Sequence, residues 1–169
     1  MGRMGDKMHL RTLAAFVATA ALAACSAPEA REASAETDVA AIEQAAHGSF
    51  VDAINSNDTE TLMGVLTDDV AFQYPGTELV GKDDVREWVQ GYYDAYTTRW
   101  EKTSHGFTVD GATAWERYSY KATDTDKATG EVTTDTGKGM NVYRRGEDGQ
   151  WRVALDGWSS DKVAGEVNE

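Results

Sequence analysis

The segment from Trp151 to Trp158 carries the side chains best suited to chemistry in this sequence. Successive side chains of a strand point to opposite faces. The alternation defines an apolar face of Trp151, Val153 and Leu155 and a mixed face of Arg152, Ala154, Asp156 and Trp158. We expect the apolar face to belong to the core. The mixed face places a carboxylate beside an indole, which indicates a pocket wall where Asp156 could exchange protons. The alternative is that Asp156 lies in solvent near the strand end.

Other aromatic and polar side chains could complete such a pocket, because rings offer contact area and a few polar groups orient a ligand. The further candidates are Tyr74, Tyr92, Trp115, Asn141 and Tyr143. Core packing is the alternative explanation for each aromatic residue. His47 lies off the apolar side of its predicted helix, so we expect a surface role for it rather than catalysis.

Charge and cysteine content exclude several classes of function. The net charge is −13. Residues 1–24 carry +2, from Arg3, Lys7 and Arg11 against Asp6, so the remaining residues carry −15. Such an acidic surface repels nucleic-acid phosphates and anionic lipid headgroups, and we expect no nucleic-acid partner. Cys25 is the only cysteine and the three histidines lack zinc-ligand spacing, so we expect no disulfide, metal or cofactor.

Residues 1–24 have the pattern of an export signal, in which basic residues precede an apolar run from Leu13 to Ala24. The run is shorter than the roughly 20 residues of a membrane-spanning helix. It ends in Leu22-Ala-Ala-Cys25, which is similar to the bacterial lipobox. The resemblance implies cleavage before Cys25 and its lipidation, palmitate included. The protein would then face the periplasm from the bacterial cell envelope, and Ser26 favours the outer over the inner membrane. An ordinary secretory signal is the alternative.

The rest of the chain is expected to form a tether at 25–37, one domain at 38–162 and a tail at 163–169. Apolar residues recur with helical spacing in 38–55, 58–66 and 82–96, and a short strand is expected at 69–74. Four alternating segments follow, near 98–109, 112–124, 131–145 and 150–160, with glycines at the turns between them. Helices followed by a meander predict an α+β fold, with the helices on one face of a curved antiparallel sheet.

This order resembles the NTF2-like superfamily, most closely its SnoaL-like, DUF4440-type branch. The matching passages are Ile42–Asp58, Leu66–Gly76 with Val80–Arg86, and Tyr143–Ser159 with Asp148-Gly149 and Asp156-Gly-Trp158-Ser159. The resemblance implies a cystatin-like cone in which a bent sheet wraps the first helix and leaves a pocket at its open end. It also implies a homodimer formed through the sheet.

Ketosteroid isomerase has this fold and uses a carboxylate base with a tyrosine and a protonated aspartate. By alignment the base falls at Tyr74, the tyrosine at Phe50 and the aspartate at Asn141. The Phe50 side chain has no hydrogen-bond donor, and a tyrosine with a pKa of about 10 is a weak base. We therefore do not expect that mechanism, and Phe50 joins the pocket candidates as a wall residue.

These features favour a lipid-anchored envelope protein whose domain binds a small, partly apolar ligand. One alternative is a lyase or isomerase in which Asp156 transfers protons, and another is a non-catalytic envelope interaction protein with a vestigial pocket. A deep cavity holding Asp156 would favour the first two interpretations. A cavity filled by Trp and Tyr side chains would favour the third.

Overall fold

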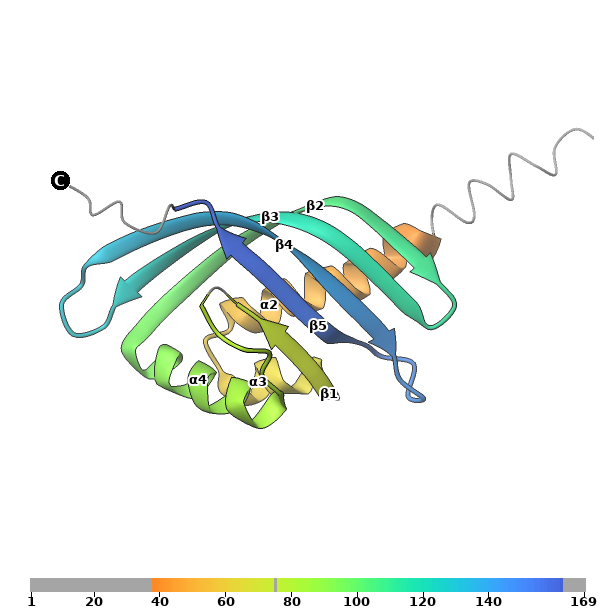
Figure 1. Cartoon of the computed structure of the whole chain (residues 1–169), viewed down its shortest axis with the longest axis horizontal. Coiled ribbons are helices and arrows are strands. Elements are labelled where there is room, and N and C mark those ends of the chain that lie inside the picture. Colours follow the sequence, from red (N-terminus) through yellow and green to blue (C-terminus); the bar gives the residue numbers. More distant parts are fainter. Residues whose placement is uncertain (1–37, 75, 163–169) are drawn as a thin grey trace, which may run out of the picture.

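A curved five-stranded sheet arches over the helices (Figure 1). The computed structural model describes residues 38–74 and 76–162. The expected signal peptide, Cys25, the tether and the tail at 163–169 lie outside the described residues. No helix within the described ranges is long and apolar enough to cross a membrane.

The helices are those that the apolar spacing predicts. Residues 38–43 are helical and continue into the π-helix η1 (Gln44–Gly48) and then α2 (Ser49–Asn55). The short α3 (Thr59–Gly64) and the longer α4 (Lys82–Ala95) follow. Asp58 caps α3, as the sequence predicts, because its Oδ1 accepts a hydrogen bond from the Thr61 backbone N–H at 2.7 Å.

The sheet contains β1 (Leu66–Gln73), β2 (Tyr96–Asp110), β3 (Thr113–Asp126), β4 (Val132–Arg145) and β5 (Trp151–Ser160), in the order β1-β5-β4-β3-β2. Strands β2 to β5 form the expected antiparallel meander. Strand β1 pairs in parallel with β5, so the sheet is mixed rather than wholly antiparallel. Strand β1 is not a neighbour of β2 in the sheet, because α4 connects β1, at one edge, to β2, at the opposite edge.

The core lies between the concave face of the sheet and the helices. Phe50 of α2, Val85 and Val89 of α4, and Tyr143 of β4 are among its most buried side chains. Strand β3 alternates strictly, and its inward side chains are Ala114, Glu116, Tyr118, Tyr120 and Ala122. The concave face therefore buries polar groups as well as apolar ones.

The two faces of β5 differ from those predicted from the sequence, because the strand contains a β-bulge. Val142 pairs with Leu155 and Tyr143 pairs with Val153, so Ala154 is an extra residue in β5. One extra residue reverses the alternation of the side chains that follow it. As a result Asp156 lies on the same concave face as Val153, and Leu155 lies on the convex face instead of in the core.

Candidate ligand-binding cavity

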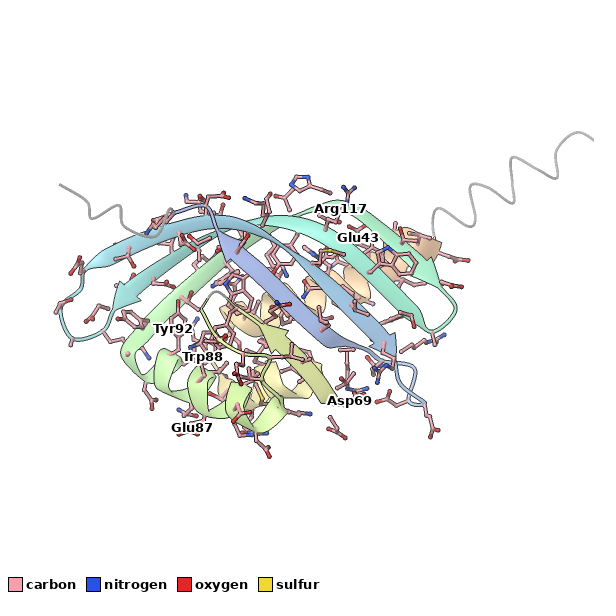
Figure 2. The ribbon with its side chains drawn as sticks, viewed as in Figure 1. Glu43, Asp69, Glu87, Trp88, Tyr92 and Arg117 are labelled. Carbon is pink, nitrogen blue, oxygen red and sulfur yellow. The ribbon has the colours of Figure 1, made fainter. Side chains whose placement is uncertain are left out.

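A cavity of about 190 Å³ lies between the concave face and the helices. Every helix from α2 to α4 and every strand contributes to its wall. Trp88 of α4 lines the cavity and remains 37% exposed, so this part of the wall reaches the protein surface. Figure 2 shows Trp88 and Tyr92 on the side of α4 that faces the sheet, whereas Glu87 points away from it.

Aromatic rings make up much of the wall. They are Phe50, Phe72, Trp88, Tyr92, Tyr93, Trp100, Tyr120 and Trp158. Trp100 and Tyr120 stack with their ring centroids 4.6 Å apart, and Trp158 meets Trp100 edge-on at 6.3 Å. Trp88 stacks on Tyr92 at 5.7 Å. Because these rings pack on one another, the wall is held in place without a bound molecule.

Asp156 is the most deeply buried carboxylate that lines this cavity, with an exposed fraction of 5%. Its Oδ1 accepts hydrogen bonds from Asn141 Nδ2 at 2.7 Å and from the Tyr118 hydroxyl at 2.9 Å. Its Oδ2 accepts none from the described residues, and is therefore the oxygen available to a bound molecule. Burial raises the pKa of Asp156, although Lys102 and the two hydrogen bonds oppose this.

Lys102 supplies a buried positive charge next to Asp156. Its Nζ donates to Asn141 Oδ1 at 2.6 Å and lies 3.6 Å from the centre of the Tyr118 ring. Burial lowers the pKa of Lys102, and the carboxylates of Asp156 and Glu116 partly offset that effect. Asn141 thus links the ammonium to Asp156, with its carbonyl oxygen towards the lysine and its amide nitrogen towards the carboxylate.

Glu116 is a second, fully buried carboxylate behind the cavity. It accepts a hydrogen bond from the Tyr143 hydroxyl at 2.5 Å, and His47 Nδ1 lies 2.8 Å from its other oxygen. Burial alone would raise the pKa of Glu116, but the contacts with His47, Lys102 and Tyr143 outweigh it and lower the pKa. The expected surface role of His47 is wrong, since its side chain is only 16% exposed and bonds a buried carboxylate. His47 belongs to η1, where the wider turn shifts side-chain directions from the regular helical period.

Two glycines of β4 make room for the tyrosines on the concave face. A β-carbon at Gly139 would overlap the Tyr118 hydroxyl, and one at Gly137 would overlap the Tyr120 ring. Each would also overlap a backbone carbonyl oxygen of β5. These glycines therefore allow Tyr118 to reach Asp156 and Tyr120 to reach the cavity.

The structure places the predicted pocket residues in three groups. Phe50, Tyr92, Asp156 and Trp158 line the cavity. Asn141 and Tyr143 are fully buried behind it and act through hydrogen bonds to Asp156 and Glu116.

The remaining two candidates lie elsewhere. Tyr74 stacks on Trp88 and Trp158, which line the cavity, but does not itself line it and instead lines a second groove. Trp115 is 38% exposed on the convex face, because the alternation of β3 gives the concave face to Glu116 and Tyr118. Its assignment to the cavity is wrong.

Several cavity residues were missed from the sequence, namely Trp100, Lys102, Tyr120, Asp124 and Asp135. A signal for two of them was present, because Thr98, Trp100 and Lys102 alternate onto one face of β2. Nothing in the sequence marked Asp135, whose position depends on its pairing with Ala122 across β3 and β4. Arg152 pairs with Asp148 at 2.7 Å rather than with Asp156. In the ranges that the structure describes, no group of three or more His, Cys, Asp or Glu side chains could hold a metal ion.

Comparison with known proteins agrees with this architecture. The sequence pattern of the SnoaL-like domain matches residues 47–154, which include β1 to β4 and the first four residues of β5. The chain belongs to the SnoaL-like domain family. The predicted membership of the NTF2-like superfamily, and the predicted cone fold, are thereby confirmed. Among curated proteins, none matches the sequence.

Solved structures share the fold of this SnoaL-like domain. A ketosteroid isomerase-like protein from Erwinia carotovora atroseptica is 26% identical, with a TM-score of 0.65 over 75% of this chain and 98% of that one. A conserved protein from Planctomyces limnophilus is 21% identical, with a TM-score of 0.65 over 80% of this chain and 99% of that one. An NTF2-like family protein from Streptomyces avermitilis is 20% identical, with a TM-score of 0.63 over 76% of this chain and 99% of that one.

Proposed function

We propose that the SnoaL-like domain binds a small, partly apolar organic molecule in the cavity beneath the sheet. The observation that carries this proposal is an aromatic cavity of about 190 Å³ with Asp156 and Lys102 in its wall. An apolar cavity of about 150 Å³ accepts benzene, so this one suits a single ring with small substituents. A vestigial pocket filled by its own Trp and Tyr side chains would leave no such space.

The test is a titration of the protein with benzyl alcohol, followed through the NMR signals of the indole N–H groups. We expect saturable shifts of the Trp100 and Trp158 signals. Ala122→Phe should abolish them, because Ala122 lines the cavity and a phenyl ring would fill it. Met140→Ala, on the convex face, is the matched control and should bind as wild type does. Unchanged binding by Ala122→Phe, or no saturable binding at all, would contradict the proposal.

A second candidate function is proton transfer to and from carbon, as in a lyase or isomerase. It is favoured by the Oδ2 of Asp156, which accepts no hydrogen bond from the described residues, and by the raised pKa of Asp156, which brings it closer to that of a general base at neutral pH. Lys102 lines the same cavity and could stabilise negative charge that develops on a substrate oxygen. The ketosteroid isomerase residues are not present, so this would be a different arrangement of acid and base.

Exchange of the α-protons of cyclohexanone with solvent deuterium tests this second candidate. We expect exchange faster than in buffer, and its loss in Asp156→Asn. Glu101→Gln is the control, because Glu101 is an exposed carboxylate of β2. Equal exchange in wild type and Asp156→Asn would eliminate Asp156 as the base and leave ligand binding as the function.

We also propose that the mature protein is lipid-anchored at Cys25 in the bacterial cell envelope, in the outer membrane. The support is the Leu22-Ala-Ala-Cys25 sequence after a signal-type apolar run. Expressed with its signal, the protein should partition into detergent, and Cys25→Ser should remain in the aqueous phase. An unmodified, water-soluble mature chain in mass spectrometry would refute the anchor.

Pairing of two copies through the sheet is a further proposal, supported by Trp115 and Met140 on the convex face, which are 38% and 48% exposed. Light scattering of the purified protein should give the mass of a dimer. Trp115→Lys should give a monomer, because a charge would be placed in an apolar contact. A monomeric wild type would contradict the proposal.

A further inference from the structure

Three carboxylates line the cavity, from Asp124, Asp135 and Asp156. Lys102 is the only cationic side chain that lines it within the described part of the chain. The ion pairs found among the described residues include none of the three, so no Lys, Arg or His nitrogen lies within 4.0 Å of these carboxylates. The cavity therefore holds more negative than positive charge.

Hydroxyl groups, not cations, hold two of these carboxylates. The Tyr120 hydroxyl donates to Asp135 at 2.7 Å, and Ser160 donates to its other oxygen at 2.6 Å. Thr98 donates to Asp124 Oδ1 at 2.5 Å. Neutral donors fix the position of each carboxylate but leave its charge uncompensated, and both residues are only half-buried.

Lys102 does not neutralise this part of the cavity. Its Nζ is held by Asn141 and by the face of the Tyr118 ring, and its nearest ion-pair partner is Glu116 at 4.0 Å. Glu116 is not among the lining residues. The lysine charge acts on Asp156 and Glu116, and its Nζ lies within 4.0 Å of neither Asp124 nor Asp135.

Aromatic rings surround the uncompensated carboxylates. Tyr120 both bonds Asp135 and stacks on Trp100, and Trp158 stands edge-on against Trp100. The face of an aromatic ring carries negative electrostatic potential and attracts cations, and indole is the strongest of the aromatic side chains in this respect. The aromatic rings and the carboxylates therefore both favour a positive charge on a bound molecule.

We propose that the ligand of this cavity is a small organic cation, an amine or quaternary ammonium group on a partly apolar body. This inference rests on the proposed binding function and names the chemical class of its ligand. The net charge of −13 attracts such a molecule from solution, and the same field opposes an anionic one. The Oδ2 of Asp156 adds an acceptor for an N–H of a primary amine.

Benzylammonium, benzyl alcohol and benzoate test the inference, because they have nearly the same size and differ in charge. Dissociation constants for the purified full-length protein come from the same NMR titration. We expect benzylammonium to bind about tenfold more tightly than benzyl alcohol, and benzoate to bind most weakly. Benzoate or benzyl alcohol binding as tightly as benzylammonium would overturn the cation inference and leave the binding function standing. No binding of any probe would overturn both.

Substitution of the cavity carboxylates tests whether they cause the preference for a cation. Asp124→Asn and Asp135→Asn should each reduce the ratio of benzylammonium to benzyl alcohol affinity by about threefold or more, because each removes one charge. Benzyl alcohol affinity should stay unchanged, which shows that the cavity is intact. Glu101→Gln changes the net charge equally on an exposed side chain of β2 and should keep the wild-type ratio. A wild-type ratio in both aspartate variants would overturn the inference.

Discussion

Asn141 and Asp156 face each other across β4 and β5, and the Asn141 amide donates to Asp156 Oδ1 at 2.7 Å. The pair exists because Ala154 is bulged out of register, which turns Asp156 onto the concave face. Both residues are buried, so Asn141 provides a neutral partner to a carboxyl group that water reaches poorly. Burial raises the pKa of Asp156, the Asn141 hydrogen bond is one of the contacts that oppose this, and the first prediction follows from the raised pKa.

Asp156→Asn should become more stable relative to wild type as the pH rises. Burial raises the folded-state pKa of Asp156 above the ordinary 3.8, so the proton contributes stability below pH 3.8 that is lost as the pH rises through the folded-state pKa. The amide has no such proton, and its oxygen can still accept from Tyr118 and Asn141. Each tenfold difference in proton affinity corresponds to about 1.4 kcal/mol.

Urea denaturation of both proteins at a series of pH values measures this difference. The two free energies of unfolding should be close at acidic pH and should diverge towards neutral pH, with the variant higher. Parallel curves would mean that Asp156 has the same pKa in the folded and unfolded states. Loss of stability in the variant at all pH values would indicate that the carboxylate is structural.

Lys102→Met should destabilise the fold by about 3–5 kcal/mol, because it leaves the buried Glu116 carboxylate without its ammonium neighbour. The similar shape of methionine limits the packing change. Lys121→Met is the matched control, since Lys121 is an exposed residue of β3, and it should change stability by less than about 0.5 kcal/mol. Equal midpoints of chemical denaturation for the two variants would show that the buried ammonium contributes no stability.

Gly139→Ala should destabilise the protein by about 1–3 kcal/mol, because its β-carbon would overlap the Tyr118 hydroxyl and the Gly157 carbonyl oxygen. Gly91→Ala is the control, because Gly91 lies in α4 with nothing within 4 Å of an added β-carbon. That control should gain about 0.5–1 kcal/mol from helix propensity. Thermal unfolding should show a lower Tm for Gly139→Ala and a higher Tm for Gly91→Ala. A higher Tm for Gly139→Ala would contradict the close packing of Tyr118.

Trp151→Ala should cost about 3–5 kcal/mol, as truncation of a large core aromatic does. Trp151 is 9% exposed and packs in the core cluster, which agrees with the face assigned to it from the sequence. Trp115→Ala, which removes an indole that is 38% exposed, should cost under about 1 kcal/mol in the monomer. Denaturation of both variants by guanidinium measures the difference, and a reversed order would mean that the two faces are exchanged.

The sequence by itself determined the elements and the family. Helical spacing, the Asp58 cap and the alternation of the last four strands are local features, and each depends on residues close together in the chain. The four strands of the meander differ from their expected bounds by only a few residues at either end. The matched passages were likewise enough to identify the SnoaL-like domain.

Only the tertiary structure decided which side chains meet in the cavity. The bulge at Ala154 depends on how β5 pairs with β4. Alternation alone predicts that Asp156 and Val153 lie on opposite faces of the strand, whereas the bulge places them on the same face. The contact of Lys102 with Asn141 joins residues 39 positions apart, and that of His47 with Glu116 joins residues 69 apart. Such contacts depend on strand register and on the phase of the helix. A shift of one residue moves every side chain of a strand to the opposite face, and it rotates the side chains around a helix. Residue types therefore predicted that a pocket exists, and the pairing of distant strands determined its charge.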